Sequence, residues 1–511
     1  MLQSKSGGGS SHRVVLPNEK ALHHLVTDIA VALEPGDMVT LSGDLGAGKT
    51  TFARALIRRL AGDPAIEVPS PSFTLMQTYE LPRFPLVHAD LYRLSDTSEL
   101  DELGFEDLPT GAVVLFEWPD RAAGSLPPDR FDITFTLSPQ RGLDYRDVRI
   151  TGHGRFAQRA ARLAAERKFV DEAGCGEAAR ERIAGDASAR SYQRLTARGR
   201  PLILMNSPRR PDGPAVRKGK PYSALAHLAE DVTPFVALAN GLRERGLSAP
   251  EILATDLAEG FLLLEDLGST PVVEGDPGAP IPERYQAATD LLVELHGQRL
   301  PDTLPVTPQL VHRIPSYDLD ALLIEAELLL DWYLPYRGVA VTGTIRDTYT
   351  AMWRDALEPA LAAPRTWVLR DFHSPNLLWL PERTGIARVG LLDFQDALMG
   401  PAGYDVASLL QDARVDVPEE LEIELLGRYA TARRHADANF DVAAFVQMYS
   451  TLAAQRAAKI LGIFARLDRR DGKPQYLRHL PRVWGYLERA LVHPTLARLE
   501  LWFQAHVPPP G

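Results

Sequence analysis

The chain has 511 residues and a net charge of −11, with 45% hydrophobic and 24% charged residues. This length is more than one hydrophobic core normally supports, so it predicts two or three domains of ordinary globular composition. Neither half has the basic surplus of a dedicated nucleic-acid binder, because residues 1–152 carry 14 Lys and Arg against 21 Asp and Glu, and the remainder carries 42 against 46. Its apolar runs are far shorter than the roughly 20 residues of a membrane helix. We therefore expect a cytoplasmic protein without membrane contact.

Residues 1–12 are expected to form a flexible tail, because they contain the run SKSGGGSS and lack the charged-then-apolar order of a signal peptide. The single cysteine, Cys175, excludes an internal disulfide and a multi-cysteine zinc site. Since nothing near it in the sequence would activate a thiol, we expect it to be a partly buried structural residue.

Residues 13–152 alternate helix-like and strand-like segments. The expected helices are 18–33 and 50–60, and the expected strands are 38–41, 86–88, 113–116, 132–137 and 147–150. Strands that alternate with helices imply an α/β sheet with substantial parallel pairing.

A phosphate-binding loop is predicted at residues 43–50. Their sequence, GDLGAGKT, fits G-x-x-x-x-G-K-[ST] and stands between a predicted strand and a predicted helix, as the motif requires. Its glycines let backbone N–H groups wrap the phosphates, Lys49 reaches the terminal phosphates, and the Thr50 hydroxyl can hold Mg²⁺. The alternative is a structural Gly-rich turn. The residues expected to bind ATP are Gly43, Asp44, Gly46, Ala47, Gly48, Lys49, Thr50 and Thr51.

Three further segments follow the loop in order, namely SPSFTL at 70–75, HADLYRL at 88–94 and LFEWP at 115–119. With the loop they resemble the TsaE family, the ATPase subunit of the bacterial machinery that makes threonylcarbamoyladenosine at tRNA position 37. The resemblance covers roughly residues 13–150. It implies a P-loop ATPase domain whose partners are the subunits of a tRNA threonylcarbamoyltransferase complex, so that tRNA is reached only indirectly.

Two carboxylates are candidate Mg²⁺ ligands of this domain. Glu117 ends an apolar strand near the phosphate loop, and Asp90 offers a second carboxylate for the same ion. Thr74 stands where a switch loop would sense the terminal phosphate. The alternatives are a helix cap for Asp90 and a surface strand end for Glu117, while Trp118 is either a packing residue or an exposed ring that contacts the nucleotide or a partner.

The rest of the chain follows the plan of a bilobal kinase. An amphipathic helix at 155–170 and strand-like segments at 192–196, 202–205 and 261–264 come first, and long helical patterns dominate from 282, interrupted by a strand-rich island at 367–394. We expect a kinase N-lobe over residues 153–280 and a mainly helical C-lobe over 281–511.

A kinase motif lies in that island. Residues 369–378, LRDFHSPNLL, contain D-x-x-x-x-N, and LLDF follows at 391–394. A kinase needs one carboxylate to accept the substrate hydroxyl proton, and an amide and a second carboxylate to hold Mg²⁺ on ATP. We therefore expect Asp371 to be the catalytic base and Asn376 and Asp393 to be metal ligands. The alternative is a packed strand–turn–strand with incidental carboxylates.

With GYDVA at 403–407, this pattern resembles the aminoglycoside phosphotransferase-type kinases, and more closely the AmgK-type sugar 1-kinases of cell-wall recycling. The closer resemblance spans about residues 155–500. It implies ATP-dependent phosphorylation of the anomeric hydroxyl of the amino sugars N-acetylmuramate and N-acetylglucosamine. The segments that carry it include GDASARSY at 185–192, where Ser188 and Arg190 are expected to contact ATP, LMNSP at 204–208 and GFLLLEDLG at 260–268.

Some positions depart from the pattern of the wider superfamily. Leu369 stands where a His usually precedes the catalytic Asp, and Asn206 stands near where protein kinases place the ATP-binding Lys. Arg190 either replaces that charge or is a solvated loop residue, and Arg370 balances local carboxylates. Four other residues each have two possible roles. His296 is either a buried helix residue or a catalyst. Glu325, Glu327 and Trp332 either line a sugar pocket or belong to a packed helix.

Other functions remain open at this point. The kinase half could act on an aminoglycoside, choline or homoserine, or be a regulatory pseudokinase. The ATPase half could be a nucleotide-switched binding module that turns over ATP only inside its complex.

Overall fold

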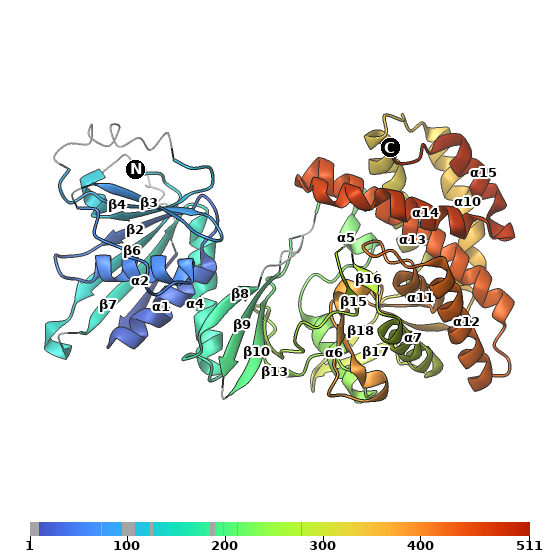
Figure 1. The fold of residues 1–511 in the computed structure, drawn as a ribbon, viewed down its shortest axis with the longest axis horizontal. Helices are drawn as coiled ribbons and strands as arrows, with labels where there is room; N and C mark the ends of the chain where they lie inside the picture. The colour runs from blue at the N-terminus through green and yellow to red at the C-terminus, as the bar shows by residue number, and fades with distance from the viewer. Residues whose placement is uncertain are drawn as a thin grey trace, which may run out of the picture. The chain divides into compact units, whose positions relative to one another are not determined.

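The structure is a computed structural model that describes residues 10–72, 74–94, 108–122, 126–142, 144–183, 190–197, 199–211, 213–276 and 278–511. The chain divides into two compact units, Met1–Asn206 and Ser207–Gly511 (Figure 1). Within the described ranges, no helix is long and apolar enough to cross a membrane.

The first unit is built on a seven-stranded sheet with the order β1-β7-β6-β2-β5-β4-β3. Its middle is parallel, because β2 pairs with β5 and β6, and β4 pairs with β5. The edges β1, β7 and β3 are antiparallel to their neighbours. This confirms the predicted α/β sheet. The strands are β1 (Ser10–Leu16), β2 (Met38–Ser42), β3 (Met76–Glu80), β4 (Pro85–Asp90), β5 (Val113–Glu117), β6 (Arg130–Leu137) and β7 (Arg146–His153).

The first strand corrects the expected tail. Residues 10–12 belong to β1, which pairs with β7 from Ser10 opposite Gly152 to Leu16 opposite Arg146. Polar side chains are compatible with an edge strand, because one face meets solvent while the backbone N–H and C=O groups bond to the neighbouring strand. Residues 1–9 lie outside the described residues.

Two helices, α1 (Glu19–Ala32) and α2 (Lys49–Ala61), complete the core of this sheet. Asn18 starts α1, since its side chain accepts a hydrogen bond from the Ala21 N–H at 3.0 Å, which satisfies a free donor of the first turn. The buried core combines side chains of both helices and the strands, among them Leu25, Ile29, Leu41, Phe52, Leu56, Leu115 and Ile133.

The next helix, α4 (Phe156–Glu172), packs next to two sets of strands. Its first half adds Phe156, Ala160 and Leu163 to the core of the seven-stranded sheet. Its second half buries Glu166 near the antiparallel strands β8 (Arg180–Ile183), β9 (Ser191–Ala197) and β10 (Arg200–Asn206). The buried Cys175 follows the helix, as expected.

A buried polar cluster ties α4 to both sides. Arg180 forms ion pairs with Asp28 of α1 and with Glu166, the latter at 2.7 Å. The side-chain amides of Gln193 and Asn206 each donate to Glu166 at 2.7 Å. Burial raises the pKa of Glu166 and lowers the pKa of Arg180 to about 10. The first unit is therefore continuous from the P-loop sheet to β10.

The second unit is mainly helical and contains short antiparallel strand pairs, which confirms the predicted pattern of long helices interrupted by a strand-rich island. Its strands are β11 (Ala215–Arg217), β12 (Lys220–Pro221), β13 (Ile252–Asp256), β14 (Phe261–Glu265), β15 (Val273–Glu274), β16 (Ala279–Pro280), β17 (Thr303–Thr307), β18 (Leu310–Arg313), β19 (Arg365–Val368), β20 (Leu377–Trp379), β21 (Val389–Leu391) and β22 (Leu398–Pro401).

One long helix, α13, lies among the helices α8, α10, α11, α12 and α14, and most of its middle is buried (Figure 1). The helices of this unit are α5 (Tyr222–Leu225), α6 (Thr233–Glu244), α7 (Pro282–Gly297), α8 (Leu319–Ala326), α9 (Leu334–Tyr336), α10 (Gly343–Leu361), α11 (Gly403–Leu410), α12 (Glu419–Ala436), α13 (Val442–Asp471), α14 (Leu480–Leu491) and α15 (Ala497–His506).

Candidate functional site

The phosphate loop connects the end of β2 to the start of α2 in the first unit. Gly43, Gly46 and Gly48 all have positive φ, and a Cβ on Gly43 would lie 2.4 Å from the Phe135 carbonyl oxygen. Only glycine fits such a position without strain. The loop therefore has the backbone path that turns its N–H groups toward a bound phosphate.

Lys49 opens α2 and is buried. Its ammonium donates to the Gly43 and Asp44 carbonyl oxygens at 2.7 and 3.0 Å and lies 3.6 Å from the ring centroid of Trp118. Burial lowers the pKa of Lys49, although nearby carboxylates oppose this shift. Thr51 is exposed on the first turn of the same helix. Trp118 thus packs over the loop lysine, with positive φ in its own backbone.

The structure brings both predicted carboxylates to the loop. Asp90 and Glu117 end the adjacent parallel strands β4 and β5 and lie directly opposite each other. Glu117 accepts a hydrogen bond from the Thr50 hydroxyl at 2.7 Å, and Asp90 accepts one from Ser70 at 3.0 Å. Neighbouring parallel strands end at the same sheet edge, which explains why residues distant in sequence converge here.

A histidine that the sequence analysis did not single out orients Glu117. His88 Nε2 lies 2.9 Å from the second carboxylate oxygen of Glu117, and both side chains are buried. The position of His88 two residues before Asp90 on the same strand was the available signal, because strand residues i and i+2 point to one face. Thr74, expected to sense the terminal phosphate, is exposed before β3, and its role stays a prediction.

These residues fit ATP with Mg²⁺. The ion prefers oxygen ligands and is normally held by one or two protein groups together with phosphate oxygens. The Thr50 hydroxyl and the Glu117 and Asp90 carboxylates are of this chemical type, and the loop backbone suits phosphates. Among the described residues, no cluster of three or more His, Cys, Asp or Glu side chains forms a separate metal cage.

The second site lies in the other unit, around the loops that follow β19 and β21. The side-chain amide nitrogen of Asn376 donates to the Asp371 carbonyl oxygen at 2.9 Å, so its amide oxygen is the atom left for a metal ion. The Leu392 N–H donates to the Asn376 carbonyl oxygen at 2.9 Å, which brings Asn376 next to the strand end that carries Asp393. Asp393 has a φ of 55°, and the Gln395 amide donates to its carboxylate at 2.9 Å.

Buried charges hold the Asp371 loop in place. Asp405 of α11 accepts hydrogen bonds from the Leu369 and Arg370 N–H groups at 2.6 and 2.8 Å. Burial raises the pKa of Asp405 to about 7. Arg370 turns inward and pairs with the fully buried Glu325 of α8, as expected for a residue that balances carboxylates. The Leu369 side chain is buried at the position where the superfamily has a His.

Glu325 is the centre of this charge cluster. It also accepts from Lys459 of α13 at 2.8 Å and from the Tyr317 hydroxyl at 2.5 Å. Burial alone would raise the pKa of Glu325, but Arg370 and Lys459 hold it at about 2. Glu325 is therefore a buried structural anion, which favours the packed-helix interpretation of this residue over a sugar contact.

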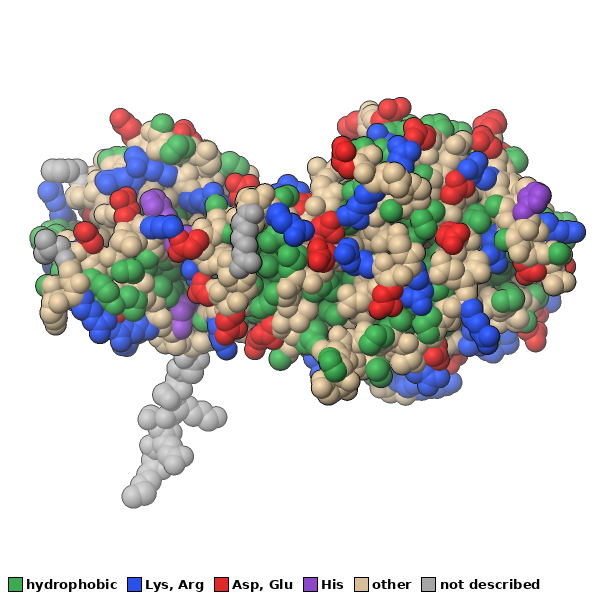
Figure 2. All heavy atoms as spheres, turned by 90° about the horizontal axis from the view of Figure 1, so that it is seen from below, with side chains coloured by type: hydrophobic (Ala, Val, Ile, Leu, Met, Phe, Trp, Pro, Cys, Tyr) green, Lys and Arg blue, Asp and Glu red, His purple; other side chains and the backbone are tan. Residues whose placement is uncertain are grey.

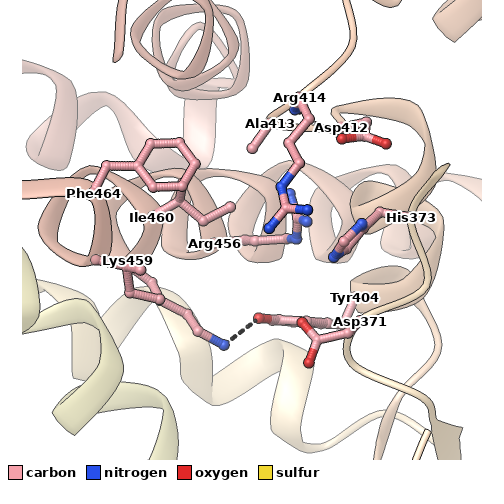
Figure 3. Close-up of a pocket in the computed structure, with 11 residues that line it drawn as sticks. Asp371, His373, Tyr404, Asp412, Ala413, Arg414, Arg456, Lys459, Ile460 and Phe464 are labelled. Carbon is pink, nitrogen blue, oxygen red and sulfur yellow. Dashed lines mark hydrogen bonds between the residues drawn. The ribbon is translucent and has the colours of Figure 1, made fainter. Parts of the chain in front are cut away.

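A pocket opens beside Asp371 (Figure 3). Arg456 and Lys459 of α13 and Arg414 line it together with His373 and Tyr404, and Lys459 donates to the Tyr404 hydroxyl at 3.1 Å. These cations lie far downstream of the kinase motif and are not among the site residues predicted from the sequence. The signal was present in the sequence, because Arg456 and Lys459 interrupt the otherwise apolar face of a long helix at helical spacing.

The remaining candidates take varied positions. His296 is buried on α7 with its Nδ1 2.9 Å from the Tyr429 hydroxyl, which favours the interpretation as a buried helix residue. Glu327 pairs with Arg217 and Arg346, and Trp332 is half-buried. Asn206 contacts Arg162 and Glu166. Arg190 precedes β9, and Ser188 lies outside the described residues, so both ATP contacts stay predictions.

Comparison with known families gives a match for each half. Residues 16–144 match the family described as threonylcarbamoyl adenosine biosynthesis protein TsaE, and residues 179–446 match the phosphotransferase enzyme family known as APH. An N-acetylmuramate/N-acetylglucosamine kinase of Caulobacter vibrioides is 39% identical over 360 residues, which are 68% of this chain and 97% of the relative.

Two further relatives extend the comparison. An N-acetylmuramate/N-acetylglucosamine kinase of Pseudomonas aeruginosa is 34% identical over 318 residues, 61% of this chain and 84% of its own length. The tRNA threonylcarbamoyladenosine biosynthesis protein TsaE of Rickettsia felis is 40% identical over 124 residues, 24% of this chain and 72% of its own length. The chain belongs to both families.

It therefore combines two ATP-using enzymes, a TsaE-type ATPase domain and a kinase-like phosphotransferase domain of the APH family. This confirms the predicted fold class, an α/β P-loop domain followed by a bilobal α+β kinase-like domain. The exact boundary at residue 152 and the limits of the kinase lobes stay predictions. The comparisons concern the families, so the residue roles at both sites stay predictions as well.

Proposed function

We propose that the phosphotransferase domain is an anomeric kinase for N-acetylmuramate and N-acetylglucosamine. The observation that carries this proposal is the pocket in which Asp371 lies beside cations, together with the sugar kinases that the domain resembles. A polycationic aminoglycoside would require several carboxylates in its pocket. This pocket has two carboxylates, Asp371 and Asp412, against the three cations Arg414, Arg456 and Lys459, and this excess of positive charge favours a neutral or anionic sugar.

Asp371 has the position of the general base. Its carboxylate accepts the proton of the anomeric hydroxyl while the sugar oxygen bonds to phosphorus and the bond to ADP breaks. Asn376 and Asp393 supply oxygen atoms of the kind that Mg²⁺ prefers. Bound Mg²⁺–ATP would supply the phosphoryl group and the charge neutralisation. The products are ADP and a sugar 1-phosphate.

The kinase proposal is tested on the full chain by following the sugar product, since both domains turn over ATP. The protein is incubated with Mg²⁺–ATP and, separately, N-acetylmuramate, N-acetylglucosamine, an aminoglycoside, choline and homoserine. Mass spectrometry and ³¹P NMR are expected to show phosphate on C1 of the two amino sugars, with Asp371→Asn as the control. Product from another substrate alone would replace the proposal, and no product at all would indicate a pseudokinase.

For the TsaE domain we propose ATP hydrolysis with Mg²⁺ held by Thr50, Glu117 and Asp90, in support of threonylcarbamoyladenosine formation on tRNA. The buried Thr50–Glu117–His88 chain beside the loop lysine carries this proposal. On the face drawn in Figure 2, acidic and basic side chains are interspersed. This distribution, with the acidic net charge, favours contact with a protein complex that carries the tRNA.

This second activity is tested in a bacterium depleted of its own TsaE. Nucleosides from its tRNA are digested and threonylcarbamoyladenosine is quantified by mass spectrometry. The full chain and its Asp371→Asn variant are expected to restore the nucleoside, and Lys49→Ala is not. Equal restoration by Lys49→Ala would contradict an ATP-driven role and favour a nucleotide-independent binding module.

A further inference from the structure

The pocket beside Asp371 contains a buried cation, Arg456, that forms no ion pair with a carboxylate of the described residues, although Asp405 lies within its electrostatic reach and Asp412 lines the same pocket. Arg456 is only 6% exposed, and its hydrogen bond goes from one guanidinium nitrogen to the neutral Gln411 carbonyl oxygen at 3.0 Å. No ion pair joins Arg456 to a carboxylate of the described residues. A buried guanidinium that is hydrogen-bonded only to a carbonyl and has no carboxylate in direct contact is suited to an anion brought by a ligand.

The neighbouring cations do not share this property. Lys459, three residues further along α13, forms an ion pair with Glu325 at 2.8 Å and is hydrogen-bonded to Tyr404. Arg370 is likewise held by Glu325 and turned away from the pocket into the core. Charge around Asp371 is thus divided between a structural cluster centred on Glu325 and a guanidinium at Arg456 that faces the pocket.

The geometry of the pocket fits a small anionic group. Figure 3 shows the guanidinium groups of Arg456 and Arg414 converging between α13 and His373, on the same side as the Asp371 carboxylate. The cavity measures about 100 Å³. Since roughly 10–15 Å³ of such space accommodates one water molecule, a carboxylate-bearing side group fits within it.

We propose that Arg456 is a specificity-determining residue that binds the carboxylate of an acidic sugar substrate while Asp371 faces the hydroxyl that is phosphorylated. This inference rests on the proposed sugar kinase function and deepens it. N-acetylmuramate carries a lactyl carboxylate that N-acetylglucosamine lacks, so the two sugars differ by the group that Arg456 would recognise. A guanidinium is suited to this task, because its planar fork binds both oxygens of a carboxylate.

The test compares both sugars on the full chain. Arg456→Met is expected to lower kcat/KM for N-acetylmuramate by about 10- to 150-fold, which corresponds to the roughly 1.5–3 kcal/mol of a hydrogen bond to a charged group at about 1.36 kcal/mol per tenfold change. The value for N-acetylglucosamine is expected to change by less than about threefold. Arg456→Lys keeps the charge and should recover part of the loss. Arg466→Met is the matched control, because this residue lies on the same helix with its guanidinium over the Tyr222 ring.

The anion bound by Arg456 could also be a phosphate of ATP. Comparing the two sugars distinguishes these possibilities, because only N-acetylmuramate carries a carboxylate, whereas ATP is used with both. An equal loss for both sugars, with a raised KM for Mg²⁺–ATP, would show that Arg456 serves the nucleotide and would overturn the proposal. Unchanged kinetics with both sugars would overturn it as well. Far-UV circular dichroism and urea unfolding check that the variants are folded.

Calorimetric binding of each sugar distinguishes failure of this inference from failure of the kinase proposal. Wild type could phosphorylate neither sugar and still bind N-acetylmuramate more tightly than N-acetylglucosamine. If Arg456→Met removes this difference in affinity, the carboxylate subsite is supported and the kinase proposal is contradicted. If wild type binds neither sugar, both proposals fall.

Discussion

At the scale of single residues, Asp371 and Asp393 are expected to respond differently to the same substitution. Asp371→Asn keeps the size of the side chain but cannot accept a proton, and general base catalysis is worth on the order of 10²–10⁴ in rate. Sugar phosphorylation should therefore fall at least about 100-fold with an almost unchanged KM for Mg²⁺–ATP. Asp393→Asn should lower the rate and also raise that KM, because its predicted role is to hold the metal. Steady-state kinetics at varied Mg²⁺ measures both, and identical behaviour of the two variants would contradict the assignment.

Glu117 is the corresponding residue of the TsaE domain. Glu117→Ala removes the carboxylate that meets Thr50 at 2.7 Å, and we expect ATP turnover to fall about 100-fold while nucleotide affinity changes less than about threefold. The reason is that a metal ion stabilises charge that develops in the transition state more than in the bound ground state. Fluorescent-nucleotide binding and phosphate release measure the two quantities. Glu117→Gln separates loss of charge from loss of packing. Full turnover by either variant at saturating Mg²⁺ would show that Glu117 only ends a strand and has no role in ATP turnover.

The residues of the two sites differ in how well sequence alone could identify them. Gly43, Lys49 and Thr50 stand in one short motif, and Asp90 and Glu117 end strands whose parallel pairing follows from the α/β pattern. Arg456 has no such local context, because only tertiary packing brings the middle of α13 to the Asp371 loop. His88 is intermediate, since its strand was predicted but its contact with Glu117 required the register of β4 and β5.

At the scale of secondary-structure elements, Glu325 joins α8 to α13 and to the loop after β19. Glu325→Gln would leave Arg370 and Lys459 buried without their shared anion, and breaking a buried ion pair typically costs about 3–5 kcal/mol. We expect the free energy of unfolding to fall by about that amount, as measured by urea denaturation. Asp331→Asn is a control, because its ion pair with Arg346 is largely exposed and exposed pairs contribute about 1 kcal/mol or less.

The same cluster predicts a pH dependence. The folded protein holds the pKa of Glu325 at about 2, below the model-peptide value of 4.5. Such a depressed carboxyl pKa stabilises the fold above the unfolded value, and this contribution is lost as the pH falls from about 4.5 toward 2. Glu325→Gln should lack this part of the acid dependence. If the free energy of unfolding decreases equally with falling pH in wild type and in Glu325→Gln, the depressed pKa of Glu325 is contradicted.

Sequence patterns predicted some of the secondary-structure elements and missed others. The phosphate-loop strand and helix were predicted because an apolar run meets a motif of known context. Residues 10–12 were expected to be part of a tail because of the Gly/Ser-rich run at 4–11, yet backbone pairing with β7 makes them an edge strand. Edge strands need little apolar surface, and their presence depends on a partner strand that is distant in sequence.

At the scale of the whole molecule, α4 shows that the first unit does not end with the TsaE sheet. Arg180 on β8 reaches back to Asp28 on α1. Arg180→Met would remove the ion-pair partner of the buried Glu166 and leave Asp28 with only Arg167, at 3.6 Å. We expect a loss of about 3–5 kcal/mol in the unfolding free energy of this unit. Arg182→Met, at an exposed position of the same strand, should cost no more than about 0.5 kcal/mol. Equal effects of both substitutions on urea unfolding would show that the cluster does not join these elements.

Lys49→Ala tests whether the two chemistries in one chain are independent. The substitution removes the only side-chain charge of the phosphate loop apart from Asp44, and loss of one such stabilising group typically lowers turnover on the order of 10²–10³-fold. Sugar phosphorylation should stay within about twofold of wild type, because Asp371, Asn376 and Asp393 belong to a separate motif in the other unit. Lys20→Ala, an exposed lysine of the same domain, is the control. Phosphate release without sugar and ³¹P detection of the sugar product measure the two activities separately. Parallel loss of both in a folded variant would mean that nucleotide at the P-loop controls the kinase, and the buried Arg180 cluster would then be the first connection to break by mutation.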